Sequence, residues 1–490
     1  MFLRFNVFKI RMPKILWNSY KAVNAFDEYV SSEHKLRVET KKISNFIGRY
    51  STKRLQTTVK NSENAISQRG ITFRVYSEDK PADHYWPLDI IPRIITKKNW
   101  TKISKGLIQR VRALNLFIND VYNEQRIFKE KIIPKKIILE SGNFRKECLG
   151  VKPPFKVWAN ICGSDLVRDI NGEFLVLEDN LRVPSGVSYM LENRMVMKSV
   201  FPEIFAKQKI NPVDEYCSKL YSCMRSLSKN KKNPNLAILT PGVYNSAYFE
   251  HVYLAQQMGV ELVEGSDLFV EKDKVYMKTV GGKEQLHSLY RRIDDLFLDP
   301  KVFYKKSLIG VPGILKAWKK GNISILNAPG SGVADDKVVY SYVPKMIKFY
   351  LNEEPLINQV ETFLCHEKKQ RDYVIKNISK LVVKPANESG GYGILMGPTA
   401  SIKEKSDCIK NIKKNPRNYV AQPLINLSTS PTLINNQLEP RHIDLRPFIL
   451  SGANNYVTQG GLTRVALKKS SMIVNSSQGG GSKDTWILDN

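Results

Sequence analysis

The stretch LVVKPANESGGYGILMGP, from Leu381 to Pro398, is the part of the sequence that decides the fold. It begins with Leu381–Val383, an apolar, β-branched run typical of a buried strand, and Lys384 follows directly. A loop with three glycines at positions 390–393 comes next, and then a second strand-like run. Glycines let backbone N–H groups approach an anion, and a nearby lysine adds positive charge. Strands on both sides exclude a Walker loop. The pattern therefore indicates phosphate binding, although a plain hairpin turn remains the alternative.

The composition is that of a large globular protein with an excess of positive charge. The chain has 490 residues, a formal net charge of +29, 42% hydrophobic residues and 25% charged residues. Such a length is enough for two or three subdomains. The charge suits either a nucleic acid or an anionic substrate. Because the basic residues are scattered, without a long Lys/Arg block or an RNA-binding signature, we do not expect nucleic-acid binding.

The spacing of the cysteines and the length of the apolar runs indicate the cellular compartment of the protein. Six cysteines occur without CxxC or CxxH spacing, which argues against a structural zinc site and a secreted disulfide framework. No apolar run is long enough to span a bilayer, and residues 1–17 lack the features of a signal peptide. We therefore expect a cytoplasmic protein that does not bind membranes.

A second stretch, VWANICGSDLVRDINGEFLVLEDNLRVPSG at 157–186, predicts a β-hairpin. Its Asn-Gly pair at 171–172 lies between two apolar runs, which is the strongest short-range hairpin signal. The alternative is a surface hairpin with ordinary acidic residues.

The hairpin would bring three oxygen-bearing side chains together. Asp165 lies on the first strand, while Glu178 and Asn180 share one face of the second because strand side chains alternate. Asp179, between them, would face the opposite side and meet a structural partner or solvent. Two carboxylates and an amide oxygen suit a magnesium ion that carries phosphates.

The region 235–267 predicts a βαβ unit with a Pro-Gly turn after its first strand. Ligands of open α/β sheets bind outside the carboxyl ends of the strands, so the turn and the start of its helix are candidate substrate contacts. A plain turn and helix start is the alternative, and salt bridges are the default reading of YRRIDD at 290–295. The candidate substrate contacts are Tyr244, Asn245, Ser246, His251, Arg292 and His442.

From Gly70 to Leu488 the chain resembles the circularly permuted ATP-grasp family, in its uncharacterised type 2 group. The resemblance rests on GITFRVY, QRVRALNLF, LEDNLRVPSGVSYMLENR, NSAYFEH, YRRIDD, GVADDK, ESGGYG, EPRHIDLRPF and NSSQGGGSKDTW. The chain is more distantly similar to the ligase domain of glutathionylspermidine synthase. Relative to ordinary ATP-grasp ligases, the metal hairpin has moved ahead of the nucleotide-binding segments. Residues 1–69 match poorly.

The resemblance implies an α/β (α+β) fold, a circularly permuted ATP-grasp with a Rossmann-like βαβ subdomain and a helical N-terminal region. The expected divisions are a basic lead at 1–69, partly disordered or helical, a segment with a long helix and the metal hairpin at 70–233, the Rossmann-like subdomain at 234–330, and the nucleotide-binding core at 331–490. The permutation also predicts that residues 479–481 lie close to the start of the strand at 157–165.

The resemblance further implies ATP and Mg²⁺ as cofactors, with Asp165, Glu178 and Asn180 as metal ligands. The implied ATP-binding residues are Lys337, Lys384, Glu388, Ser389, Gly390, Gly391, Tyr392, Gly393 and Gln422. Gly163 stands where some relatives carry an arginine, so Arg182, Arg446 or Arg464 would neutralise the transferring phosphate. The loop at 388–393 is expected to be a mobile lid.

The implied activity is that of an ATP-dependent ligase, which activates a carboxylate as an acyl phosphate for attack by an amine or thiol and forms a peptide-like amide bond. The substrates would be small-molecule or peptide acids and amines, which the sequence does not identify, and the oligomeric state is open. The alternatives are a catalytically silent ATP-binding regulatory protein, a basic nucleic-acid-binding protein, and a phosphotransferase that forms a stable phosphoester.

Overall fold

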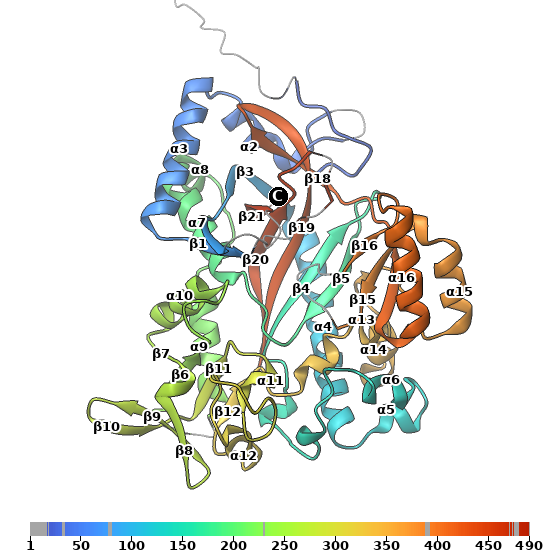
Figure 1. Ribbon diagram of the computed structural model, residues 1–490. Coiled ribbons are helices and arrows are strands. Elements are labelled where there is room, and N and C mark those ends of the chain that lie inside the picture. The colour runs from blue at the N-terminus through green and yellow to red at the C-terminus, as the bar shows by residue number, and fades with distance from the viewer. Residues whose placement is uncertain are drawn as a thin grey trace, which may run out of the picture.

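The computed structural model describes residues 17, 19–31, 35–76, 81–228, 231–387, 393–469, 471–472, 474 and 480–489. Within these residues the largest sheet has eight strands, in the order β13-β5-β4-β19-β20-β21-β3, with β18 paired to β19 (Figure 1). The strands are β3 (Leu88–Thr96), β4 (Ile161–Arg168), β5 (Phe174–Asn180), β13 (Asn358–Gln359), β18 (Thr429–Ile434), β19 (Gln437–Ser451), β20 (Asn455–Val465) and β21 (Gly481–Leu488). The predicted hairpin is β4–β5, and it pairs directly with β19, a strand from the far end of the sequence.

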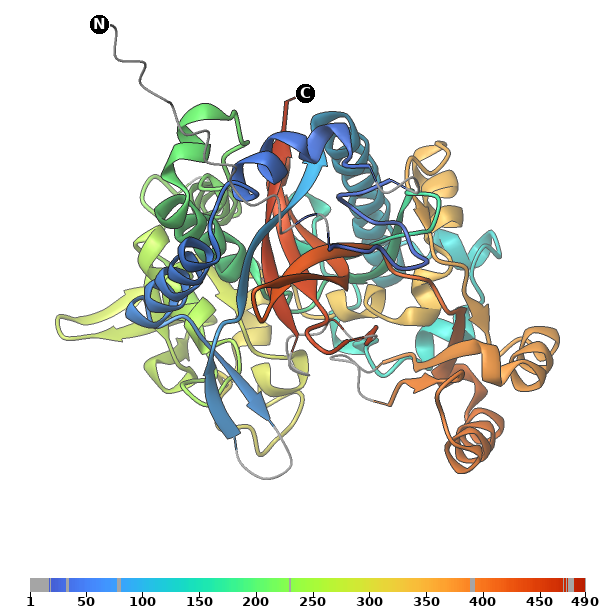
Figure 2. The ribbon, with the colours of Figure 1, turned by 90° about the horizontal axis from the view of Figure 1, so that it is seen from above.

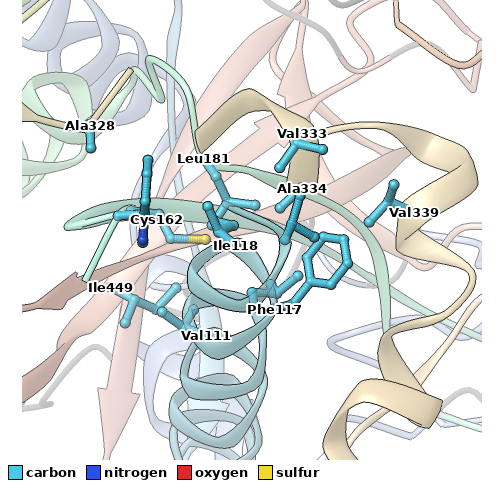
Figure 3. Packing of buried hydrophobic residues seen from close by; sticks show 14 of the residues in the cluster. Val111, Phe117, Ile118, Cys162, Leu181, Ala328, Val333, Ala334, Val339 and Ile449 are labelled. Carbon is cyan, nitrogen blue, oxygen red and sulfur yellow. The ribbon is translucent and has the colours of Figure 1, made fainter. Parts of the chain in front are cut away.

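The long helix α4 (Lys97–Tyr122) packs against this sheet and forms the core with it. It begins after Thr96, whose hydroxyl accepts a hydrogen bond from the Asn99 N–H at 3.3 Å, a normal N-cap. Its apolar positions recur at helical spacing, as the sequence predicts. Figure 3 shows Val111, Phe117 and Ile118 of the helix beside residues of the strands and of the segment 328–339. The helix therefore supports the back of the strands that carry the candidate metal ligands.

The predicted βαβ unit forms a parallel sheet of its own, in the order β12-β11-β6-β7. Its elements are β6 (Leu236–Leu239), α10 (Tyr248–Met258), β7 (Glu261–Val263), β11 (Ser288–Arg291) and β12 (Ser324–Leu326). Gly259 ends α10 in the left-handed conformation (φ 64°), which glycine adopts at low cost. The expected Rossmann-like subdomain is thus present. The sheet of β8 (Leu268–Glu271), β9 (Lys274–Thr279) and β10 (Gly282–Gln285) projects from it (Figures 1 and 2).

The glycine-rich stretch belongs to an antiparallel sheet in the order β14-β17-β15-β16. Its strands are β14 (Phe363–Leu364), β15 (Leu381–Pro385), β16 (Leu395–Met396) and β17 (Tyr419–Pro423). Helices α15 (Lys368–Lys376) and α16 (Ile402–Lys414) lie beside this sheet (Figure 1), and Ile378, Val383 and Ile412 are buried between the layers. The sheet connects to the core through α13 (Lys337–Tyr340) and α14 (Val343–Leu351).

The N-terminal region is helical, and it packs on the edge of the large sheet (Figure 2). Ile43, Ile47 and Leu55 meet Ile91 and Trp486 there. Its elements are η1 (Val38–Thr40), α2 (Lys41–Ile47), α3 (Thr52–Gln68), β1 (Thr72–Tyr76) and β2 (Pro81–Tyr85). No helix among the described residues is long and apolar enough to cross a membrane.

The remaining elements connect these layers. The helices are α5 (Arg126–Lys129), α6 (Lys135–Leu139), α7 (Val187–Val200), α8 (Pro202–Lys207), α9 (Tyr216–Ser226), α11 (Asp295–Leu298) and α12 (Ile314–Lys319). The 3-10 turns are η2 (Lys146–Cys148), η3 (Pro154–Lys156), η4 (Gly265–Asp267), η5 (Ser331–Ala334), η6 (Ile378–Lys380) and η7 (Pro416–Asn418).

Candidate active site

The hairpin β4–β5 brings Asp165 opposite Glu178, and Gly163 opposite Asn180. The pairing is not regular, because Leu166 pairs with Val176 whereas Asp165 pairs with Glu178, so β5 contains one extra residue. Such a bulge reverses the alternation of side chains along the strand. Val176 is buried in the core beneath the sheet, and beyond the bulge it is Asp179 that is buried. Glu178 and Asn180 are half-buried and share the opposite face.

Asp179 is held by protein partners on the α4 side of the sheet. Its Oδ2 accepts a hydrogen bond from Arg110 Nε at 2.7 Å, and its Oδ1 accepts one from the Ser164 hydroxyl at 2.8 Å. The side chains of Arg110 and Asp179 are 1% and 2% exposed. The sequence-based expectation that Asp179 meets a structural partner agrees with this arrangement.

Asp165 is buried between two arginines, one from the neighbouring strand β19 and one from β20, the next strand of the sheet. Arg446 Nε lies 2.5 Å from its Oδ1, and Arg464 Nη2 lies 2.8 Å from its Oδ2. Burial by itself would raise the pKa of Asp165, but the two guanidinium groups outweigh burial and hold the pKa below its usual range. The carboxylate is therefore ionised and fixed in orientation near neutral pH.

Each of the three candidate arginines has a carboxylate partner. Arg464 also binds Asp444, with Nε to Oδ1 at 2.9 Å. Arg182 Nε donates to Asp335 Oδ2 at 2.7 Å, and its Nη1 lies 3.2 Å from Asp294. Arg446 and Arg464 thus lie together at Asp165, while Arg182 lies beside the loop that leads to Lys337.

Two lysines approach the open face of the hairpin from different elements. Lys337 begins α13, and its Nζ lies 3.8 Å from Glu178 Oε2. Lys384, on β15, donates to Gln422 Oε1 at 2.7 Å across the β15–β17 pair. Burial lowers the pKa of Lys384 to about 8, a shift that Lys337 reinforces and Glu178 opposes. The structure therefore groups Lys337, Lys384 and Gln422 with the hairpin.

The donor set suits magnesium better than a softer metal. Among the residues that the structure describes, no three His, Cys, Asp or Glu side chains gather closely enough to hold an ion by themselves. Magnesium is usually held by one or two carboxylates and completes its shell with water and phosphate oxygens. Asp165 and Glu178 supply two carboxylates. The Asn180 side chain donates a hydrogen bond from Nδ2 to the Gly163 carbonyl at 3.1 Å. This bond uses the amide nitrogen and leaves the amide oxygen as a third candidate ligand.

Several of the candidate substrate contacts lie elsewhere or are already bound by the protein. His251 is 1% exposed and binds the Thr240 hydroxyl, while Arg292 is 3% exposed and donates to Glu250 and to the Pro184 carbonyl. His442 Nδ1 contacts the Leu427 carbonyl at 2.8 Å. Tyr244, Asn245 and Ser246 form the exposed or half-buried turn before α10. The structure therefore does not group these six residues with the hairpin.

Some predictions fall on residues outside the described part of the chain, namely Glu388, Ser389, Gly390, Gly391 and Tyr392. Gly393 is described. Its φ is +70°, and an added Cβ would come 2.9 Å from the Pro385 ring, so this position requires glycine.

The predicted proximity of residues 479–481 to the start of the first hairpin strand is wrong for the part of that run that is described. Gly481 pairs with Val465, whose partner on β19 is Ile443. The start of β4, at Ile161, instead pairs with Leu450, farther along the same strand. The two points are therefore separated both across and along the sheet, because the chain enters β21 at the end opposite to that where β4 begins.

Sequence reasoning missed several residues that build the site. Arg110, Asn115 and Asp120 lie on α4, and polar residues on an amphipathic helix ordinarily face solvent or another helix, but all three are buried. Asn115 accepts hydrogen bonds from two backbone N–H groups just before β4, and Asp120 accepts two at the start of α5. An arginine or aspartate within an apolar helical stripe is the only sequence signal for such roles.

Asn327 was also missed. It is fully buried, accepts a hydrogen bond from the Ile161 N–H and donates to the carbonyls of Ile161 and Leu181, each at 2.7 Å. One side chain therefore joins the start of β4 to the segment that follows β5.

Comparison with known proteins agrees with this geometry. Residues 92–466 match the family model described as circularly permuted ATP-grasp type 2. The chain belongs to this family. It is 51% identical over 472 residues to an uncharacterised protein of Synechocystis, covering 96% of this chain and 98% of the relative. An uncharacterised protein of Mycobacterium tuberculosis is 46% identical over 466 residues, covering 95% and 84% of the two chains.

Two further similarities are more distant. A Frankia alni protein provisionally named glutamate–cysteine ligase 2-3 is 39% identical over 483 residues, which cover 97% of this chain but only 55% of the relative. A solved structure, a glutathione synthetase-like effector from Globodera pallida in its apo form, superposes with a TM-score of 0.59 at 11% identity and covers 90% and 98% of the two chains. The second similarity shows that the two proteins share a fold.

Proposed function

We propose that the protein is an ATP-dependent ligase that joins a carboxylate to an amine or thiol. The observation that carries the proposal is the convergence on one hairpin of two lysines, two arginines and a magnesium-type donor set, in a chain of the ATP-grasp family. The name of the Frankia relative points in the same direction.

The proposed roles follow from charge and position. Lys337 and Lys384 bind phosphate oxygens of ATP, as does the loop 388–393, and Gln422 orients the Lys384 ammonium. Asp165, Glu178 and Asn180 hold magnesium, which when bound offsets phosphate charge. Arg446 and Arg464 stabilise negative charge on the transferring phosphoryl group, and Arg182 holds the loop before Lys337 through Asp335. Catalysis of this kind rests on positioning and electrostatics.

The proposed reaction has two steps. A carboxylate oxygen of the acid attacks the γ-phosphorus of ATP, ADP leaves, and an acyl phosphate forms. The amine nitrogen then attacks the acyl carbon, inorganic phosphate leaves, and the amine gives up a proton. This route needs no nucleophile from the protein. Consistent with it, burial raises the pKa of the Cys162 thiol, on the hairpin itself, well above its usual value.

We also propose the functional division of the chain that the sequence suggests. Residues 331–490 would bind nucleotide, 70–233 would supply the metal hairpin, 234–330 would contribute to substrate binding, and 1–69 would be a leading segment. The substrates would be small molecules or peptides, encountered in the cytoplasm.

The decisive experiment measures ADP release in the presence of magnesium and pooled amino acids, peptides and polyamines. We expect ADP only when an acid and an amine are both present, and much less from Glu178→Gln. Glu63→Gln is the matched control, because Glu63 is exposed on α3. Binding of an ATP analogue without ADP release from any pool would indicate a regulatory protein instead. Absence of nucleotide binding would refute the proposal.

A further inference from the structure

The N-terminal residues 19–31, which we call the strap, lie outside the segment that matches the family model, yet they reach into the large sheet. Asp27 forms a bridge with Thr429, the first residue of β18. The Glu28 N–H donates to the Thr429 carbonyl, and the Thr429 N–H donates to the Phe26 carbonyl, each at 2.8 Å. The strap is thus hydrogen-bonded to the sheet like an additional short strand.

Glu28 is the strap residue that reaches farthest inward. Its side chain is fully buried and binds Arg93 of β3 at 2.5 Å and Arg168 of β4 at 2.7 Å. The Ser428 hydroxyl donates to it at 2.9 Å. Burial favours the neutral acid, but the two arginines outweigh burial and lower the pKa of Glu28, so the carboxylate is charged. A buried carboxylate that pairs with two arginines fixes the relative positions of the strands that carry them.

Both arginines lead to the candidate metal ligands. Arg168 is the last residue of β4, and Asp165 lies three residues before it on the same strand. Arg168 Nε donates a hydrogen bond to the Gly172 carbonyl in the hairpin turn at 2.7 Å. Arg93 donates to the Asp444 carbonyl at 3.1 Å. Asp444 binds Arg464, which in turn binds Asp165. Glu28 therefore connects to Asp165 along two routes, one through Arg168 and the backbone of β4, and one through the contacts of Arg93, Asp444 and Arg464.

Phe26 adds a packing constraint on the same hairpin. The Arg168 guanidinium lies between the rings of Phe26 and Phe174, at 4.1 and 4.7 Å from their centroids. Gly172, with φ at +85°, lies directly against Phe26, since an added Cβ would come 2.5 Å from that ring. The strap therefore packs on the turn end of the metal hairpin.

We propose that the strap is a working part of the active site, in which Glu28 is a positioning residue that fixes the β4–β5 hairpin and sets the magnesium requirement of nucleotide binding. This inference rests on the proposed function. Glu28→Gln would leave Arg93 and Arg168 close together without their shared counter-charge, and the hairpin would shift to separate them.

The test measures, by calorimetry, how the binding of an ATP analogue to the full chain depends on magnesium concentration. Substituting a residue that orients metal ligands typically weakens metal affinity by about 10- to 100-fold. We therefore expect the magnesium concentration needed for half-saturation to rise about tenfold in Glu28→Gln. Phe26→Leu, which keeps all charges, should show a smaller rise and provides a second variant if Glu28→Gln does not fold.

Leu55→Ala is the matched structural control. Leu55 is 1% exposed in the same N-terminal core and carries no charge, so its loss should lower the melting temperature without changing the magnesium requirement. Hydrogen exchange of the nucleotide-free protein should also quicken at 165–180 in Glu28→Gln more than in Leu55→Ala. Equal effects of the two variants on both measurements, or no effect of Glu28→Gln, would overturn the inference. Failure of the unmodified chain to bind nucleotide would overturn the proposed function, and this inference with it.

Discussion

Neutralising two adjacent carboxylates on β5 should have opposite consequences. Asp179→Asn leaves the Arg110 guanidinium, whose side chain is 1% exposed, without its charged partner. Breaking a buried pair in this way costs about 3–5 kcal/mol of unfolding free energy. Glu178→Gln changes a side chain that is 31% exposed and lies 3.8 Å from Lys337, so its cost in stability should be about 0–1 kcal/mol. Its effect should fall on function instead. Losing the negative charge of this proposed magnesium ligand should lower turnover roughly 100- to 1000-fold.

Urea unfolding and the magnesium dependence of ADP release, measured on both variants, would separate these effects. We expect Asp179→Asn to unfold at a clearly lower urea concentration and to keep its magnesium requirement where it remains folded. Glu178→Gln should unfold almost normally and need far more magnesium. Arg110→Met combined with Asp179→Leu provides a control, since replacing both partners removes the unpaired charge. The assignment of the two faces would be refuted if Asp179→Asn raised the magnesium requirement and Glu178→Gln lowered only stability.

Three other outcomes follow from the same geometry. Because burial lowers the pKa of Lys384 to about 8, the ammonium is lost above that pH, and calorimetry should show ATP-analogue affinity falling by up to about tenfold per pH unit above pH 8. Lys384→Met should bind weakly, without that slope. Asn327→Ala should cost about 2–4 kcal/mol in urea unfolding, because backbone groups of Ile161 and Leu181 lose their partner; normal stability would contradict this role. Hydrogen exchange at 388–394 should slow when ATP analogue binds, and unchanged exchange would argue against a closing loop.

Local patterns were sufficient to predict the elements that carry the candidate site. The Asn-Gly pair at 171–172 marks the turn between β4 and β5, and the β-branched run before Lys384 marks β15. Period-two alternation separated Glu178 from Asp179. Gly259, at which α10 ends, is a local signal of the same kind. These signals are strong because each depends on residues that are close together in the sequence.

Features that depend on distant residues could not be predicted. Simple alternation places Val176 and Glu178 on one face, whereas the bulge between them puts Val176 in the core and Glu178 in the site. Arg110 pairs with Asp179, which lies 69 positions later in the sequence, and only the folded structure reveals this pairing. Nothing local distinguishes Glu28 from an exposed glutamate. The position of Gly481 was mispredicted because chain order does not reveal at which end a strand enters its sheet.

The pairing of β4 with β19 has a consequence for how the protein is made. Asp165 and Arg446 are 281 positions apart in the sequence. At a synthesis rate of 5–20 residues per second, roughly 15–55 s pass between the addition of one and of the other. During that time the hairpin has no partner on its β19 side, and the buried carboxylate has neither of its arginines. A ribosome-bound chain therefore carries an exposed strand edge until β19 has been made, and it gains its charge-compensated centre only after Arg446 and Arg464 have both been added.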